Sequence, residues 1–406
     1  MKIRRINLID TSIVFYILCA VAANDGSVLM KTTRLVLWGV FFLNWLKKGR
    51  VKITGHVVWL FLFWVLATLS ILWAQSTEWA WNMSKTLLVN LLCMGALANL
   101  IDKKQERIAL SLKTIIAAPL LLELRVIFMG GIFAFLNTRE VGGISGNTVG
   151  LCGAFAACFA WYFWREQKSN RGSYLLLFLL NVGIVILSAS RKGLLFVGIP
   201  LAVVYVFNRR ESIAAHFVKF GAALLGAILC LVAVLKVPFL YNLIGYRIVG
   251  LFALLAGNIA AADGSSDSRM QLIQWGMEWF QEKPWLGFGI DNYRVVLVSH
   301  HPSWPISYYA HNNYVELLVD VGIVGTLLYY SLYLGMILKL YRYKRYWDNS
   351  IVLNVGILIA LLVGDMALVS YYGKYIQVLL LIIWIITDNF VCNCKRNRGW
   401  SQNGEK

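Results

Sequence analysis

Two adjacent cations in the middle of the chain have the chemistry of an anion-binding site. Arg191 and Lys192 stand where two apolar stretches meet with almost no loop between them. A cation at the edge of a membrane span either anchors the chain among lipid headgroups or binds an anionic group. The planar guanidinium of arginine can hold a phosphate through two parallel hydrogen bonds. We therefore expect Arg191 to bind an anion and regard Lys192 as a second binding residue.

Three more arginines lie in a long polar segment, residues 236–310. Arg269 opens a predicted helix over 269–282, and an anion near that helix start would meet both the guanidinium and free backbone N–H groups. The alternative interpretation is a surface arginine paired with a nearby aspartate. Arg247 and Arg294 are also candidate substrate-binding residues, although either could simply face lipid headgroups.

A histidine closes this polar segment. His311 is followed by Asn312 at the start of the next apolar stretch. A lone histidine is usually a packed or interfacial side chain. At the lip of a cavity, however, a neutral imidazole can take a proton from a hydroxyl, and Asn312 could hold the ring tautomer or the substrate. A metal site of His300, His301 and His311 would lack an acidic ligand at matching spacing, so we expect no metal.

Arg191 and Arg269, a histidine and the lack of a metal motif together suggest chemistry on a phosphorylated lipid. Guanidinium groups can neutralise a diphosphate leaving group without a cation cofactor. The histidine would act as base for an acceptor hydroxyl. Glu316 and Asp320 lie on successive turns of the following apolar stretch, where charge is costly, and this suggests a functional role for them as well.

Membrane-spanning helices must position these residues. Of the 406 residues, 59% are hydrophobic and only 14% are charged, and the mean hydropathy is +0.66. Apolar runs near the ~20 residues that cross a bilayer recur along the whole length. The sequence predicts an all-α polytopic membrane protein of one domain, residues 1–406, with about twelve transmembrane helices. The fifth contains charged residues, so we expect it to be broken, tilted or partly outside the bilayer. The spans lie near 8–24, 28–46, 56–75, 84–101, 109–136, 148–164, 174–190, 194–208, 215–235, 312–338, 350–367 and 375–393.

The lysines and arginines predict the orientation. The net charge is +18, and the basic clusters fall in alternate gaps between the spans. The positive-inside rule then places both termini in the cytoplasm and the 236–310 segment, with its amphipathic helix, on the outer side between spans nine and ten. Nucleic acid is excluded as a partner, because there is no basic face with aromatic stacking platforms. The clusters lie at 2–5, 47–52, 103–107, 165–171, 209–210, 339–345 and 395–398.

Three motifs, together with their order along the chain, resemble those of the bacterial O-antigen ligase and polymerase family of integral-membrane glycosyltransferases. His311-Asn312, nine residues and then Gly322-x-x-Gly325 fits the signature His-Asn-x9-Gly-x-x-Gly without a gap. Ser190-Arg191 between two spans is similar to the family's first functional arginine. Ser268-Arg269 is similar to the second, and the turn Pro284–Gly289 follows it. The resemblance covers residues 175–370.

The resemblance implies a glycosyltransferase C-type fold with an active site on the outer face of the bacterial cytoplasmic (inner) membrane. The donor would be an oligosaccharide on undecaprenyl diphosphate, and the acceptor a glycan or a lipid in the same membrane. Arg191 and Arg269 would stabilise the departing diphosphate, and His311 would orient or deprotonate the acceptor. Direct displacement would invert the anomeric carbon, with neither metal nor nucleotide as cofactor. A chain-length regulator and a flippase are candidate partners.

Three functions remain open at this stage. The first is a polymerase that joins repeat units of a surface polysaccharide such as O-antigen, capsule or exopolysaccharide. The second is a ligase that moves the finished glycan to lipid A-core or another acceptor. Acceptor specificity would lie in loop residues such as Trp304, Tyr308 and Tyr309. The third is a polysaccharide transporter or flippase, for which polar residues at the bilayer midplane rather than at one face would be typical.

Overall fold

The computed structural model describes residues 7–207, 213–255 and 264–403. Helices form almost all of this part of the chain, and the one short antiparallel hairpin in it pairs β1 (Glu140–Val141) with β2 (Ile144–Ser145). The long helices are α1 (Leu8–Ala22), α2 (Val28–Lys48), α3 (Gly55–Leu69), α4 (Thr77–Ile101), α5 (Gln105–Met129), α7 (Gly146–Glu166), α8 (Arg171–Leu187), α9 (Arg191–Val206), α10 (Ile213–Lys236), α15 (Asn313–Arg342), α16 (Asn349–Gly364) and α17 (Lys374–Asn403). The other helical elements are η1 (Ser70–Trp73), α6 (Gly131–Thr138), α11 (Pro238–Leu240), η2 (Tyr241–Gly245), α12 (Tyr246–Leu255), α13 (Gly264–Glu282), α14 (Tyr293–His300) and η4 (Lys344–Tyr346).

The length and apolar composition of the helices confirm a polytopic membrane protein. Within the described residues, five helices are long and apolar enough to cross a membrane: 55–73, 77–101, 217–236, 313–342 and 374–396. Three shorter apolar helices are α1, α8 and α16. Leu179 and Leu334 are each 57% exposed, which costs little when the surroundings are lipid. Each of the twelve expected spans overlaps a helix, but the number that crosses the bilayer remains a prediction.

The fifth expected span, 109–136, is broken. Helix α5 ends at Met129, and α6 begins at Gly131, whose φ of +80° is a conformation that favours glycine. Arg125, near the end of α5, donates a hydrogen bond to the Ala22 carbonyl at 2.6 Å. Arg125 therefore lies near the chain break, where the carbonyl at the end of α1 accepts its hydrogen bond.

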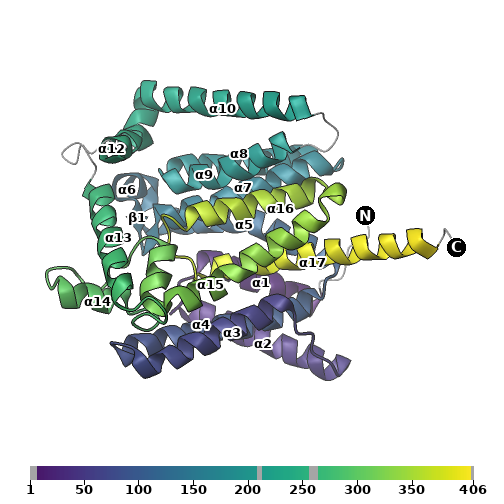
Figure 1. The fold of residues 1–406 in the computed structure, drawn as a ribbon. Coiled ribbons are helices and arrows are strands. Elements are labelled where there is room, and N and C mark those ends of the chain that lie inside the picture. Colours follow the sequence, from purple (N-terminus) through teal and green to yellow (C-terminus); the bar gives the residue numbers. More distant parts are fainter. Residues whose placement is uncertain (1–6, 208–212, 256–263, 404–406) are drawn as a thin grey trace.

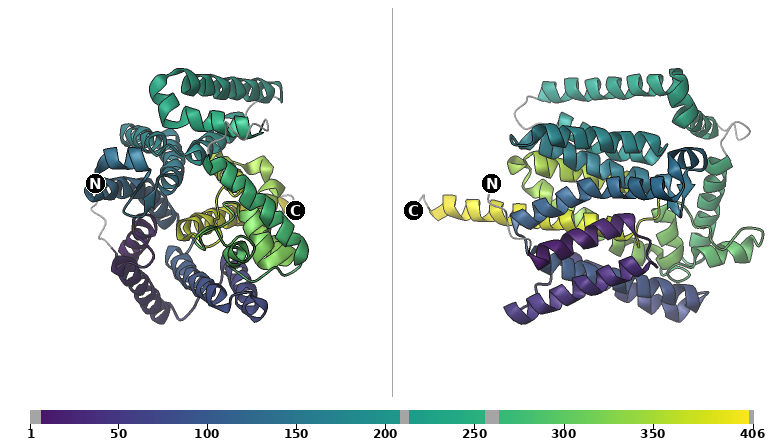
Figure 2. Two further views of the ribbon diagram at one scale, coloured as in Figure 1. Left: turned by 90° about the vertical axis from the view of Figure 1, so that its left-hand side faces the viewer. Right: turned by 180° about the vertical axis from the view of Figure 1, so that it is seen from behind.

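The bundle helices run side by side, and α13 and α14 lie across one end of them (Figure 1). Helix α1 begins and α17 ends at the opposite end, while α10 runs along the outside of the bundle beside α9 (Figure 2). Small residues permit close packing at the centre. A Cβ added at Gly356 of α16 would lie 2.7 Å from Pro200 Cα of α9.

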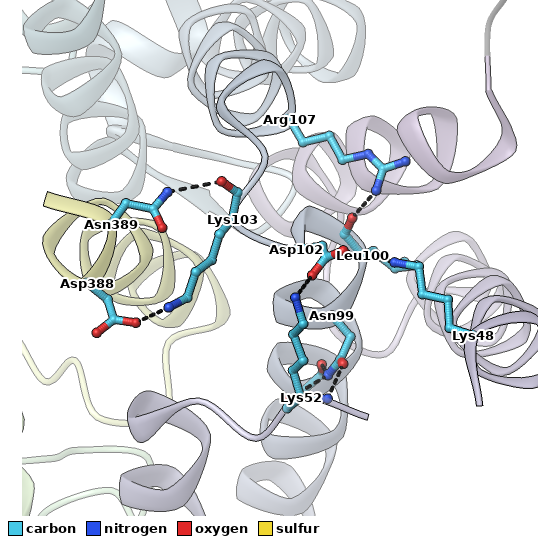
Figure 3. Close-up of polar contacts among 10 residues, drawn as sticks. Lys48, Lys52, Asn99, Leu100, Asp102, Lys103, Arg107, Asp388 and Asn389 are labelled. Carbon is cyan, nitrogen blue, oxygen red and sulfur yellow. Dashed lines mark hydrogen bonds and ion pairs between the residues drawn. The ribbon is translucent and has the colours of Figure 1, made fainter. Parts of the chain in front are cut away.

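Basic residues gather at the end where the termini lie. Lys48 and Lys52 both contact the Asp102 carboxylate, at 2.9 and 2.5 Å, and Lys103 pairs with Asp388 (Figure 3). These contacts link the α2–α3 and α4–α5 connections to α17. They lie in two of the clusters that the positive-inside rule assigns to the cytoplasm. The clusters at 2–5 and 209–210 lie outside the described residues.

Candidate active site

The turn between α8 and α9 presents the first two candidate residues. Ser190 caps α9 by accepting a hydrogen bond from the Gly193 N–H at 3.2 Å. Ala189, just before it, has a φ of +49°, so the chain turns sharply between the two helices. Arg191 and Lys192 consequently form the first turn of α9, where backbone N–H groups without intrahelical partners favour an anion.

Electrostatics show which cations surround Lys192. Its Nζ donates to the Ala367 carbonyl at 2.6 Å, in the connection between α16 and α17. Burial, and to a smaller extent the positive charges of Arg269, Arg191 and Arg139, together lower the pKa of Lys192 to about 7. Lys192 lies between the expected spans 174–190 and 194–208. The predicted anion-binding residues Arg191, Lys192 and Arg269 are therefore brought together.

Arg139 is a fourth cation of this cluster, and sequence reasoning missed it. Its Nη2 donates to the carbonyls of Ser188 and Ala189, at 3.3 and 3.1 Å, so it holds the turn that leads into Arg191. The signal was present, because Arg139 is the single basic residue in the outer gap 137–147. A basic residue on the side that the positive-inside rule leaves poor in Lys and Arg is a candidate for function.

Arg269 does not open its helix, so that expectation is wrong. Helix α13 begins at Gly264, which places Arg269 in its second turn, beyond the free N–H groups of the helix start. The helix start that belongs to the cation cluster is that of α9. The charge of Arg269 acts on His311 and on Tyr309, which places α13 against the segment before α15.

His311 lies in a strained turn directly before α15. Its φ of +54° is left-handed, and its ring contacts that of Tyr309, with the centroids 4.0 Å apart. Burial, and to a smaller extent the charges of Arg269 and Lys192, together lower the pKa of His311 to about 3. The imidazole is therefore neutral at pH 7. Asn312 caps α15, since its side-chain oxygen accepts from the N–H groups of Tyr314 and Val315, at 3.0 and 3.2 Å.

The two acidic residues of α15 have structural contacts. Glu316 accepts a hydrogen bond from the Ala310 N–H at 2.7 Å, which fixes the residue before His311. Asp320 accepts from the N–H groups of Asp291 and Tyr293, at 2.8 and 2.7 Å. Buried carboxylates with such partners fix loop backbones in place. Glu316 and Asp320 thus hold the loop against α15.

The Gly-x-x-Gly motif marks a break in α15 that receives the turn Pro284–Gly289. Gly322 has φ +63° and ψ −168°, and a Cβ there would lie 2.3 Å from the backbone of Trp285. Across the break, the Phe288 N–H donates to the Val319 carbonyl at 2.8 Å, and the Ile323 N–H to that of Pro284, also at 2.8 Å. The two sequence motifs are therefore two sides of one backbone junction.

We expect Gly322→Ala to destabilise the fold. This combination of φ and ψ is almost exclusive to glycine and costs another residue about 1–3 kcal/mol, and the Cβ would also collide with Trp285. Thermal unfolding of the purified protein in detergent should show a lower Tm. The matched control is Gly335→Ala in the same helix, where a Cβ meets no atom within 4 Å and alanine favours the helix. An equal Tm for the two variants would contradict this account.

The remaining candidates have other contacts or cannot be placed. The charge of Arg294 acts on Tyr309, as that of Arg269 does. Arg294 pairs with Asp291 at 2.9 Å and stacks over Trp79, 4.8 Å from the ring centre. Arg247 is on α12, and its side chain lies outside the described residues. His300 and His301 stack on tryptophans of α13. Within the ranges that the structure describes, no group of three His, Cys, Asp or Glu side chains could hold a metal ion.

Comparison with known proteins confirms the resemblance that the motifs indicated. Residues 175–330 match the model of a family described as O-antigen ligase. These residues include Arg191, Arg269 and His311. Two curated proteins are similar over 200 residues at 24% identity: a "Putative polysaccharide ligase" of Rickettsia felis and one with the same description from Rickettsia conorii. Each match covers 44% of this chain and 46% of the relative, so the chain spans less than half the length of these relatives.

Proposed function

We propose that this protein transfers a glycan from undecaprenyl diphosphate to an acceptor hydroxyl at the outer face of the bacterial cytoplasmic membrane. One observation carries the proposal: Arg191, Lys192 and Arg269 converge with His311 at one end of the bundle. Three cations suit a diphosphate, and a neutral imidazole suits a hydroxyl. The match to the O-antigen ligase family supports the same chemistry.

In this proposal the cations stabilise the leaving group. The bond between the anomeric carbon and the diphosphate oxygen breaks, and negative charge grows on that oxygen. Arg191 and Arg269 offer paired N–H donors, and the start of α9 adds backbone N–H groups. Direct attack by the acceptor oxygen from the opposite face inverts the configuration at the anomeric carbon. The acceptor proton passes to His311, and no metal or nucleotide is required.

Donor binding would also prepare the base. The free protein holds His311 neutral but weakly basic, because burial and the charges of Arg269 and Lys192 keep the pKa of the imidazole near 3. A bound diphosphate offsets those two charges and raises the pKa of His311. The imidazole is then a better proton acceptor when the donor is in place, which couples deprotonation of the acceptor to the presence of the diphosphate.

The pH dependence of donor binding tests the role of Lys192. A lysine with a pKa of about 7 is charged below pH 7 and loses its charge as the pH rises above it. We expect the Kd for the lipid diphosphate to rise between pH 6.5 and 8.5 in the wild type, by up to about tenfold for one lost charge-assisted contact. Lys192→Arg should remove this dependence, because arginine stays charged. A wild-type Kd that is constant over this range would remove Lys192 from the diphosphate site.

The acceptor separates two candidate functions. We favour polymerisation of surface-polysaccharide repeat units, because the sequence has no recognisable feature that is specific for one acceptor such as lipid A-core. The names of the matched family and of both relatives favour a ligase instead. Transport is the weakest candidate, since the cation cluster lies at one end of the bundle near α13, whereas a transporter binds its substrate at the midplane.

One assay distinguishes these functions. Purified protein is supplied with a lipid diphosphate-linked repeat unit as the sole substrate, and the products are separated by size on a gel. A ladder of lipid-linked oligomers supports the polymerase. Transfer that occurs only after core lipid or protein acceptor is added supports the ligase. No covalent product under either condition would contradict glycan transfer.

A further inference from the structure

A second group of cations lies at the end of the bundle that the charge pattern predicts to be outer. Arg34 of α2, Arg125 of α5 and Lys374 of α17 come from distant parts of the chain, yet all contact residues 22–25, at the end of α1 and just after it. The positive-inside rule leaves this side of a membrane protein poor in Lys and Arg. Three cations that converge there are therefore candidates for function.

Two of these cations share a single carboxylate oxygen. Arg34 Nη2 and Lys374 Nζ contact the same Oδ1 of Asp25, at 2.5 and 3.2 Å. The Asp25 side chain is 66% exposed, so water screens its charge and weakens both pairs. Lys374 also donates to the Ala23 carbonyl at 2.7 Å, which leaves one of its three N–H groups for a further acceptor. An exposed carboxylate of this kind is a counter-ion that a more strongly bound anion can replace.

Arg125 has no carboxylate partner within the described residues. Its Nη1 donates to the Ala22 carbonyl at 2.6 Å and to the side-chain oxygen of Asn24 at 3.4 Å, and its Nε contacts the sulfur of Met129. These partners are neutral, so they leave the charge of the guanidinium uncompensated. The other terminal nitrogen, Nη2, makes no hydrogen bond in the part of the chain that the structure describes, and it is accessible. Arg125 can therefore donate to an anion.

Arg125 and Lys374 both line a cavity of about 400 Å³ among α1, α4, α5, α7 and the α16–α17 connection. Its volume is in the range of small-molecule sites, about 300–1,000 Å³. Asp25 is the only acidic residue in the described part of its wall. Cations beside an apolar wall suit an amphiphile that carries an anionic group. The apolar residues include Ala20, Val21, Leu122, Leu151 and Ile376.

The cavity adjoins the candidate active site on two sides. Leu368 lines it and follows Ala367, whose carbonyl accepts from Lys192. Thr148 lines it as well and follows Asn147, whose side-chain oxygen accepts from Ser190 Oγ at 3.4 Å. An anion in the cavity would therefore lie near a diphosphate bound at the cluster around Lys192. Two anions that bind close together need separate cations, and the chain provides them.

We propose that this cavity binds the phosphate group of a second lipid through Arg125 and Lys374. A polymerase joins two substrates that are both linked to a lipid diphosphate, and the cavity would hold the acceptor. This role rests on the proposed function, whereas phosphate binding in the cavity does not. The phosphate replaces Asp25 as counter-ion of Lys374, and no covalent step occurs there. A membrane phospholipid carries the same group, so the test separates the two sources.

The test counts bound lipids by native mass spectrometry. The full-length protein in detergent is titrated with undecaprenyl diphosphate, and the wild type should bind two copies. Arg125→Gln should raise the Kd of one copy about ten- to hundredfold, as the loss of a charge-assisted hydrogen bond would, and leave the other unchanged. The matched control is Lys113→Gln, because Lys113 lies on the same helix, stacks over Phe163 and does not line the cavity. This variant should bind both copies as the wild type does.

Asp25→Asn separates phosphate binding from a structural role. The substitution removes the carboxylate that competes with the phosphate, so the Kd of the copy that depends on Arg125 should fall about two- to fivefold. A purely structural role for these cations predicts the opposite, because the loss of Asp25 would then disturb the same contacts as the loss of Arg125. A single bound copy in the wild type, or a Kd that rises or stays constant in Asp25→Asn, would overturn the proposal.

Phosphatidylglycerol identifies the source of the phosphate. If an excess of this lipid leaves the copy that depends on Arg125 in place, the cavity selects the lipid diphosphate and the acceptor role is supported. Displacement of that copy would support the phosphate site and overturn the acceptor role. The two proposals can fail separately. A second copy that depends on Arg125 in a protein that transfers no glycan would support the site and contradict the transferase.

Discussion

Replacing Arg191 or Arg269 by alanine is expected to lower kcat for glycan transfer by about 100- to 1,000-fold, the usual cost of removing one donor that stabilises a developing anion. Arg191 stands in the first turn of α9, and Arg269 approaches from α13, so each would contact the diphosphate from a different element. The loss should appear in kcat more than in KM, since charge on the leaving oxygen grows toward the transition state.

The lysine variants separate charge from geometry. Arg191→Lys and Arg269→Lys keep a positive charge but cannot form two parallel hydrogen bonds, so we expect poor rescue. The matched control is Arg171→Ala, because Arg171 is exposed at the opposite end of α8 and stacks over Trp164. Expression and Tm should stay close to wild type in all of these variants. Normal transfer by Arg191→Ala or Arg269→Ala would remove that arginine from the mechanism.

The position of the helices could be predicted from sequence because a bilayer imposes a strong pattern. Apolar runs of span length and alternate basic gaps identify helices regardless of how they pack. The break in 109–136 was expected as one of several possibilities, because its charged residues conflict with a simple span. The order of Arg191, Arg269 and His311 in recognisable motifs likewise identified the residues that the structure brings together.

The contacts between distant segments could not be predicted. Arg139 holds the turn before Arg191 although the two are far apart in sequence, and no local pattern encodes that contact. The start of α13 was placed too late, because Ser268 resembles a cap as well as the residues before it do. The roles of Glu316 and Asp320 depend on backbone N–H groups of a loop, whose course sequence periodicity does not describe.

His311→Ala is expected to lower kcat by about 100- to 10,000-fold, the usual contribution of a general base. Because His311 has a φ of +54°, alanine also strains the turn. His311→Asn is therefore the decisive variant: asparagine tolerates the left-handed conformation but cannot act as a base near neutral pH. His301→Phe is the control, since it preserves the stack on Trp275 and lies outside the cation cluster.

The pH profiles test the same residue without mutation. In the free protein His311 has a pKa of about 3, so its protonation should not lower kcat/KM between pH 7 and 5. A bound diphosphate offsets the charges of Arg269 and Lys192 and raises the pKa, so kcat should begin to fall at a higher pH than kcat/KM does. His311→Asn should lose this acid limb of kcat. Equal activity of His311→Asn and wild type would refute the base role, because the asparagine variant keeps the turn but has no group that can accept the proton.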